Sequence, residues 1–132
     1  MKSFPRWKQQ LLVFIGLALA AFTAYVQWVA PVDTLRTLGA TQVDKLAHIA
    51  GGLFVALLVE WRYPHLLRNL PRFLAFLALV TLSWEAFEFF FDAKTRFFYE
   101  TYPILWRLDA AGDIIAGFLG AYGYRVFGRS RG

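Results

Sequence analysis

The stretch LLVFIGLALAAFTAYVQWVA, residues 11–30, contains no charged side chain, and Gln27 is its only strongly polar residue. A helix needs roughly 20 mainly apolar residues to cross the hydrocarbon core of a bilayer, and this stretch has that length. A basic amino end precedes the stretch, as in a signal peptide. However, the apolar region of a signal peptide has roughly 7–15 residues, and this stretch is longer. The stretch therefore predicts an uncleaved membrane-spanning helix.

Three further apolar runs predict that the chain crosses the membrane four times. They cover about residues 43–61, 73–91 and 104–127. The prolines lie outside the runs or at their edges, where a residue without an N–H does not interrupt a helix. Because helices satisfy their own backbone hydrogen bonds in lipid, we expect an all-α bundle of four transmembrane helices. Residues 1–132 would form this single transmembrane domain.

The composition supports this class and speaks against several others. The chain has 132 residues, a length that allows one domain, and 58% of them are hydrophobic, against about half in a soluble domain. A disordered tail or a coiled coil would be far more polar. There is no cysteine, which excludes disulfides, thiol chemistry and cysteine-ligated metals.

The basic residues predict the orientation of the four helices. Of the 14 Lys and Arg residues, nine would lie on the side of both chain ends and five on the other side. The nine are Lys2, Arg6, Lys8, Arg62, Arg68, Arg72, Arg125, Arg129 and Arg131, and the five are Arg36, Lys45, Lys94, Arg96 and Arg107. The positive-inside rule then places both termini in the cytoplasm, with the protein in a bacterial cytoplasmic membrane. Since topology accounts for the net charge of +5, we expect no nucleic-acid partner.

Six ionisable residues do not fit a lipid-facing pattern, and they form three pairs. The pairs are Asp44 with His48, Glu85 with Glu88, and Asp109 with Asp113. Spacings of three or four residues place both side chains of a pair on one helix face. At 1.5 Å per residue, the pairs lie within roughly 14 Å of the outer ends of their helices. Because lipid-facing carboxylates are costly, we predict a polar pocket inside the bundle, open to the outside.

Two chemistries fit such a pocket, and spacing alone does not choose between them. All six residues are candidate ligands of a divalent cation, which could activate water against a phosphate or an ester. Alternatively, His48 and the four acids of the third and fourth spans could act as acids and bases in a proton relay. Hydrogen bonds that only hold the helices together are a third alternative. Whether the chain is an enzyme therefore stays open.

The segment DAKTRFFYETYPILW, residues 92–106, joins the third and fourth runs. Its aromatic residues are typical of the belt at a membrane surface. Lys94, Arg96 and Arg107 lie in or beside it, and they could hold a lipid phosphate at the mouth of the acidic pocket. The segment therefore predicts contact with lipid head groups.

Three motifs, taken in order, resemble those of VanZ-like membrane proteins. They are DKLAHIAGG at residues 44–52, EAFE at 85–88 and DAAGDIIAGFLG at 109–120. Many VanZ-like chains have Gln and Asn where this chain has Glu88 and Asp113, as in a related branch of small membrane proteins. The resemblance implies a four-helix fold with a site at these positions. The family is associated with low-level resistance to the glycopeptide teicoplanin, and the departures argue against that role here.

These observations lead to one main functional expectation and two alternatives. We expect an outward-facing acidic pocket that binds or acts on an envelope or lipid-linked substrate, with a divalent cation as an open alternative. A proton-coupled transporter or channel is the first alternative, and a structural or assembly subunit is the second. The lipid bilayer is the expected partner, and a homodimer is a further expectation because four spans are few for a transporter.

Overall fold

The computed structural model describes residues 4–31 and 43–128, and all regular secondary structure within them is helical. The predicted all-α class is thus confirmed for this part of the chain. The elements are α1 (Arg6–Ala24), η1 (Tyr25–Val29), α3 (Val43–Arg62), α4 (Pro64–Arg68), α5 (Leu70–Phe91), α6 (Ala93–Thr101), α7 (Pro103–Gly123) and η2 (Tyr124–Gly128), where η marks a π-helical turn that continues the preceding helix. Lys2, Arg36, Arg129 and Arg131, which entered the topology prediction, lie outside the described residues.

Prolines and a polar cap mark the helix starts. Pro64 and Pro103 begin α4 and α7, and Pro71 is the second residue of α5. A missing N–H costs no hydrogen bond at these positions. The side chain of Asn69 caps α5, because its oxygen accepts a hydrogen bond of 3.1 Å from the backbone N–H of Arg72. These local signals explain why the apolar runs located the long helices closely.

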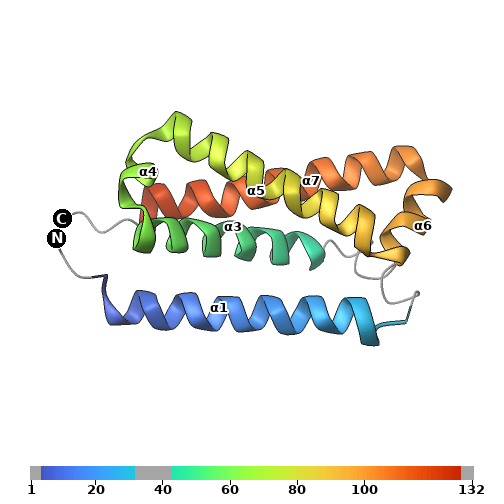
Figure 1. The fold of residues 1–132 in the computed structure, drawn as a ribbon, viewed down its shortest axis with the longest axis horizontal. Helices are drawn as coiled ribbons and strands as arrows, with labels where there is room; N and C mark the ends of the chain where they lie inside the picture. Colours follow the sequence, from blue (N-terminus) through green and yellow to red (C-terminus); the bar gives the residue numbers. More distant parts are fainter. Residues whose placement is uncertain (1–3, 32–42, 129–132) are drawn as a thin grey trace.

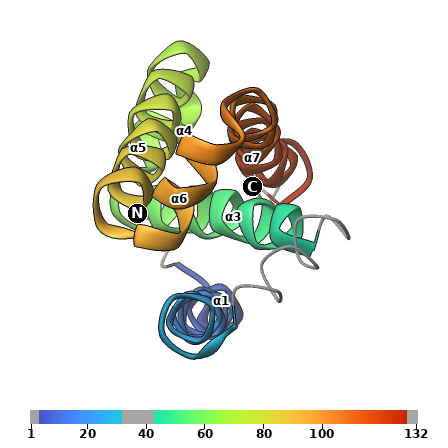
Figure 2. The ribbon, with the colours of Figure 1, turned by 90° about the vertical axis from the view of Figure 1, so that its right-hand side faces the viewer.

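The four long helices run in alternating directions along the long axis of the molecule (Figure 1). The start of α1, the short helix α4 and the end of η2 lie together at one end, which we call the α4 end. Helix α6 lies at the opposite end, which we call the α6 end. Figure 2 shows α1 standing apart from α5 and α7 and packed against α3.

Helices α3 and α7 form the central pair of the fold. A Cβ atom added at Gly52 would overlap the carbonyl oxygen of Gly117, and one added at Gly120 would overlap that of Ile49. Only glycine permits so close an approach of two helix backbones. The contact therefore sets the register in which the charged residues of α3 and α7 face each other.

The hydrophobic core lies in the half of the molecule near the α4 end. Leu57, Leu67, Phe73 and Leu77 are fully buried there, and they come from α3, α4 and the first turns of α5. No such core fills the other half, where the charged pairs and a cavity lie, as far as the described residues show. The packing therefore divides the fold into a solid half and a hollow half.

Two segments, Arg6–Val29 and Leu70–Phe91, are long and apolar enough to cross a membrane. Within the apolar 18-residue stretch of each segment, only 11% is buried inside the protein, whereas a core helix of a soluble protein would be mostly covered. Helices α3 and α7 have similar lengths, but both carry several charged side chains. Where those charges lie is described next.

Candidate functional site

Lys45 lies at the centre of the acidic residues that face each other across α3 and α7. Its Nζ atom is 2.5 Å from Oδ1 of Asp109, 2.6 Å from Oδ1 of Asp113 and 3.3 Å from Oδ2 of Asp44. One ammonium group therefore holds three carboxylates together. We call these four residues the Lys45 cluster. It lies at the start of α3, toward the α6 end of the molecule (Figure 1).

This role of Lys45 was not predicted from the sequence, where it was assigned to the outer side as a basic residue. The signal was present, because Lys45 precedes His48 by three residues, and that spacing places both side chains on one helix face. Lys45 also packs on Gly112, because a Cβ atom added to this glycine would lie 3.0 Å from the Cε atom of Lys45. Carboxylates placed close together repel one another, and Lys45 partly relieves this repulsion from within the protein.

The three aspartates also have a spacing at which a metal could bind. Asp44, Asp109 and Asp113 each offer an oxygen within 4.8 Å of the other two. However, the ammonium of Lys45 already lies within 3.3 Å of an oxygen of each aspartate. A divalent ion placed there would lie beside a positive charge that repels it. This donor set fits Lys45 as the counter-ion better than it fits a metal, and His48, Glu85 and Glu88 lie outside it.

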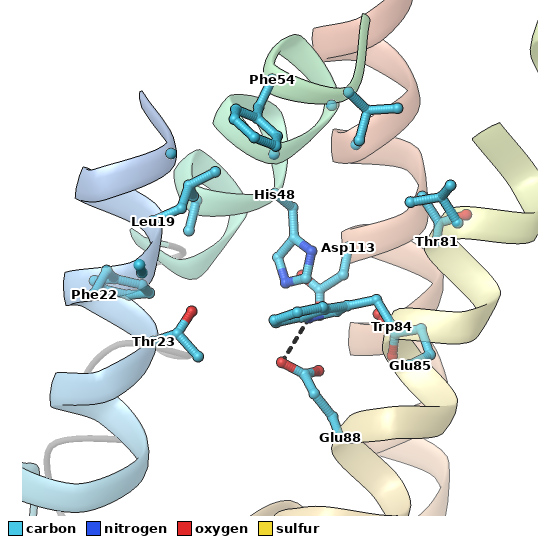
Figure 3. A pocket seen from close by; sticks show the side chains of 18 of the residues that line it. Leu19, Phe22, Thr23, His48, Phe54, Thr81, Trp84, Glu85, Glu88 and Asp113 are labelled. Carbon is cyan, nitrogen blue, oxygen red and sulfur yellow. Dashed lines mark hydrogen bonds and ion pairs between the residues drawn. The ribbon is translucent and has the colours of Figure 1, made fainter. Parts of the chain in front are cut away.

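A cavity of about 730 Å³ lies between α1, α3, α5 and α7, in the hollow half of the fold. Most of its wall is apolar, and the larger apolar side chains include Leu19, Phe22, Phe54, Val55, Leu77 and Val80. Figure 3 shows the polar exceptions that are labelled, which are Thr23 on α1, His48 on α3, Thr81, Glu85 and Glu88 on α5, and Asp113 on α7. Four of the six predicted site residues therefore line this cavity.

Asp113 connects the cavity to the Lys45 cluster. Its Oδ1 atom accepts the hydrogen bond from Lys45 and lies 3.5 Å from Nε2 of His48. Asp113 itself is only 7% exposed. Asp44 and Asp109, the other two aspartates of the cluster, do not line the cavity. The six predicted residues thus divide into two adjoining groups that share Asp113.

The two glutamates of α5 have different surroundings. Glu88 accepts a hydrogen bond of 2.9 Å from Nε1 of Trp84, drawn as the dashed line in Figure 3. Glu85 makes no hydrogen bond or ion pair with any other residue that the structure describes. Both side chains are half-buried. The cavity therefore has a carboxylate at its polar end that the described part of the protein leaves without a donor.

The three basic residues predicted to hold a lipid phosphate have different roles. The Nζ atom of Lys94 donates to the backbone oxygens of Val26 and Ala30, at 3.1 and 2.8 Å. These contacts satisfy carbonyl groups at the end of η1 and tie α6 to the first helix. Arg96 and Arg107 are exposed. The side chains of Phe98 and Tyr99 in the same segment lie outside what the structure describes.

A second polar cluster lies at the α4 end, away from the cavity. The fully buried Lys8 on α1 places its Nζ atom 2.9 and 2.8 Å from the two carboxylate oxygens of Glu60, and 3.1 Å from the carbonyl oxygen of Gly128. Tyr124 donates its hydroxyl hydrogen to the same carboxylate. We call Lys8, Glu60 and Tyr124 the Lys8 cluster. The sequence analysis treated Lys8 only as a topology residue and did not predict this pairing.

Comparison of the chain with known protein families, curated proteins and solved structures finds no match. The resemblance to VanZ-like proteins therefore stays a prediction from three short motifs.

Proposed function

We propose that the chain is a multi-pass membrane protein in which α1, α3, α5 and α7 all cross the bilayer. The apolar character of α1 with η1 and of α5 supports two of these spans. The charges of α3 and α7 do not argue against the other two, because most of them pair within the protein through Lys45 and Glu60. Paired charges inside a bundle cost far less than charges that face lipid.

The proposal places the α4 end in the cytoplasm of a bacterium. Lys8 and Lys45 lie in clusters with acids at opposite ends, so they largely cancel in the comparison of the two sides. The remaining described basic residues near the α4 end are Arg6, Arg62, Arg68, Arg72 and Arg125, against Lys94, Arg96 and Arg107 near the α6 end. This excess supports a cytoplasmic location of both chain ends by the positive-inside rule.

The cavity is proposed to bind an envelope or lipid-linked molecule with an apolar tail. The observation that carries this proposal is a cavity of about 730 Å³ with a long apolar wall and carboxylates at one end only. Sites for small molecules have volumes of about 300–1,000 Å³ and combine apolar walls with a few polar groups. In the proposed orientation the polar end lies in the outer half of the membrane, where an amphipathic molecule would place its head group.

Two glycines provide a matched test of this binding function. A Cβ atom added at Gly51 or at Gly123 would meet no atom within 4 Å, but only Gly51 lines the cavity. Both sites therefore accept the first atom of a larger side chain without overlap, and leucine also favours the helix. Gly51→Leu should reduce the amount of amphiphile that native mass spectrometry detects on gently purified protein, whereas Gly123→Leu should not. Equal amounts on the two variants, or none on the wild-type protein, would contradict the proposal.

One observation favours proton passage as a second candidate function. A continuous series of polar contacts leads from Asp109 through Lys45 and Asp113 to His48, with distances of 2.5, 2.6 and 3.5 Å. Such a series can pass protons between the outer surface and the cavity. A proton-coupled transporter should acidify proteoliposomes when its solute gradient is applied, and Glu85→Gln should abolish this flux. The binding proposal instead predicts no flux in either protein.

A further inference from the structure

We infer that the cavity binds an amphiphile whose head group is a cationic amine or ammonium. This inference rests on the proposed binding function and specifies the class of ligand. The charged residues that line the cavity are Glu85, Glu88 and Asp113, all of them acids. No lysine or arginine lines it among the residues that the structure describes. The ligand must therefore be compatible with a wall that carries three acidic side chains and no lysine or arginine among its described residues.

The negative charge at the polar end is only partly balanced by the protein. Asp113 shares the ammonium of Lys45 with two further aspartates. Glu88 has the neutral donor Trp84, and Glu85 has no hydrogen-bond or ion-pair partner within the described part of the chain. Carboxylates that are partly removed from water are costly unless a positive charge accompanies them. A cation in the cavity would supply the charge that the described residues lack.

Aromatic side chains at the same end also suit a cation. Trp84 and Trp28 both line the cavity, and Figure 3 shows the indole of Trp84 between Glu88 and the pair His48 and Asp113. Indole rings attract ammonium groups through their electron-rich faces, at centroid distances of about 6 Å or less. An ammonium beside Trp84 could therefore interact with both the ring and the glutamates.

The remaining wall defines the tail and excludes anionic head groups. Leu77 and Val55 lie on the cavity wall toward the middle of the molecule, so a tail would extend inward from a head group at the glutamates. A phosphate at that end would meet charges of its own sign, which disfavours binding. Lys94 is one of the three basic residues predicted to hold a phosphate, and it donates instead to the carbonyls of Val26 and Ala30.

The test uses the full chain in nanodiscs and a panel of probes read by native mass spectrometry. Dodecyltrimethylammonium combines the tail with a cation, dodecylphosphate combines the same tail with an anion, and tetramethylammonium has no tail. The ligand could come from the bilayer or from solution, so a second arm builds a trimethylammonium lipid into the nanodisc. We expect adducts with the cationic amphiphile in at least one arm, and weaker binding of both other probes by about tenfold or more.

Variants of the glutamates show whether the carboxylates cause this preference. Glu85→Gln combined with Glu88→Gln keeps the side-chain size and an acceptor for Trp84, so the fold should be retained. The double variant should bind the cationic amphiphile about tenfold more weakly and dodecylphosphate no more weakly than the wild-type protein. Glu100→Gln removes an exposed acid of α6 that does not line the cavity, and it should change neither affinity.

The results separate failure of this inference from failure of the binding function. Equal or tighter binding of dodecylphosphate by the wild-type protein would overturn the inference, and so would an unchanged cation preference in the double variant. If either result is found and Gly51→Leu still blocks the binding of dodecyltrimethylammonium or of dodecylphosphate, the proposed binding function stands. If no tailed probe binds in either arm, both proposals fail.

Discussion

The two ends of α3 show how a similar set of side chains can build two different kinds of site. At the α4 end, Lys8 is fully buried and meets the single carboxylate of Glu60. At the α6 end, Lys45 has 16% of its side chain exposed and meets three carboxylates. Each lysine bridges α3 to another helix, but only the Lys45 cluster adjoins the cavity, through Asp113.

The two clusters differ in charge balance, and in our proposal this difference distinguishes a structural joint from a ligand site. An ammonium group has three N–H donors, and Lys8 directs its donors to two oxygens of Glu60 and to the carbonyl of Gly128. One positive charge and one negative charge cancel there, around a fully buried ammonium group. The Lys45 cluster instead keeps an excess of negative charge beside a cavity, and that excess is available to a ligand or to protons.

The largest expected effect comes from breaking the balanced cluster. Lys8→Met leaves the partly buried carboxylate of Glu60 without its cation, and removal of one partner of a buried pair costs at most about 3–5 kcal/mol. Thermal or denaturant unfolding of purified protein should show this loss, and adding Glu60→Gln should recover part of it. Arg6→Met changes an exposed cation of the same helix and serves as the control. A stability of Lys8→Met equal to that of the control would contradict a structural role of the joint.

A smaller loss of stability and a larger change in ligand binding are expected at the other cluster. Lys45→Met removes charge-assisted hydrogen bonds worth about 1.5–3 kcal/mol, and water can partly compensate because the cluster is less enclosed. Lys45→Met should also alter amphiphile binding measured by native mass spectrometry, whereas Lys8→Met protein that still folds should not. Equal binding by both variants would remove the functional distinction between the clusters.

The smallest expected effect distinguishes two aspartates that the sequence paired as equals. Asp109 has 43% of its side chain exposed, whereas Asp113 has 10%. An exposed ion pair contributes little, so Asp109→Asn should stay within about 0.5 kcal/mol of the wild-type unfolding free energy. Asp113→Asn should cost more stability and should also weaken binding in the cavity. A larger effect at Asp109 than at Asp113 would show that the enclosed contact is not the important one.

Part of the candidate site could be predicted from helical spacing, and part could not. Spacings of three and four residues placed His48, Glu85, Glu88 and Asp113 on helix faces, and the structure brings all four to one cavity. The same rule, applied to Lys45, would have put a cation among them. Without Lys45, a divalent cation stayed among the open alternatives for the pocket. Spacing shows which side chains share a face, but it does not show which face of another helix lies opposite.

The helical class and the long helices can be predicted from the sequence, because apolar length, prolines and a polar cap act locally along the chain. The sequence also shows where charged residues lie within the apolar runs. By contrast, the contacts of Lys8 with Glu60 and of Lys45 with three aspartates, and the cavity between α1 and α5, arise only in the folded chain. These contacts depend on the register of α3 against α7, which the close approach of Gly52 to Gly117 sets. Such a register is a property of two packed surfaces, so no single segment of sequence contains it.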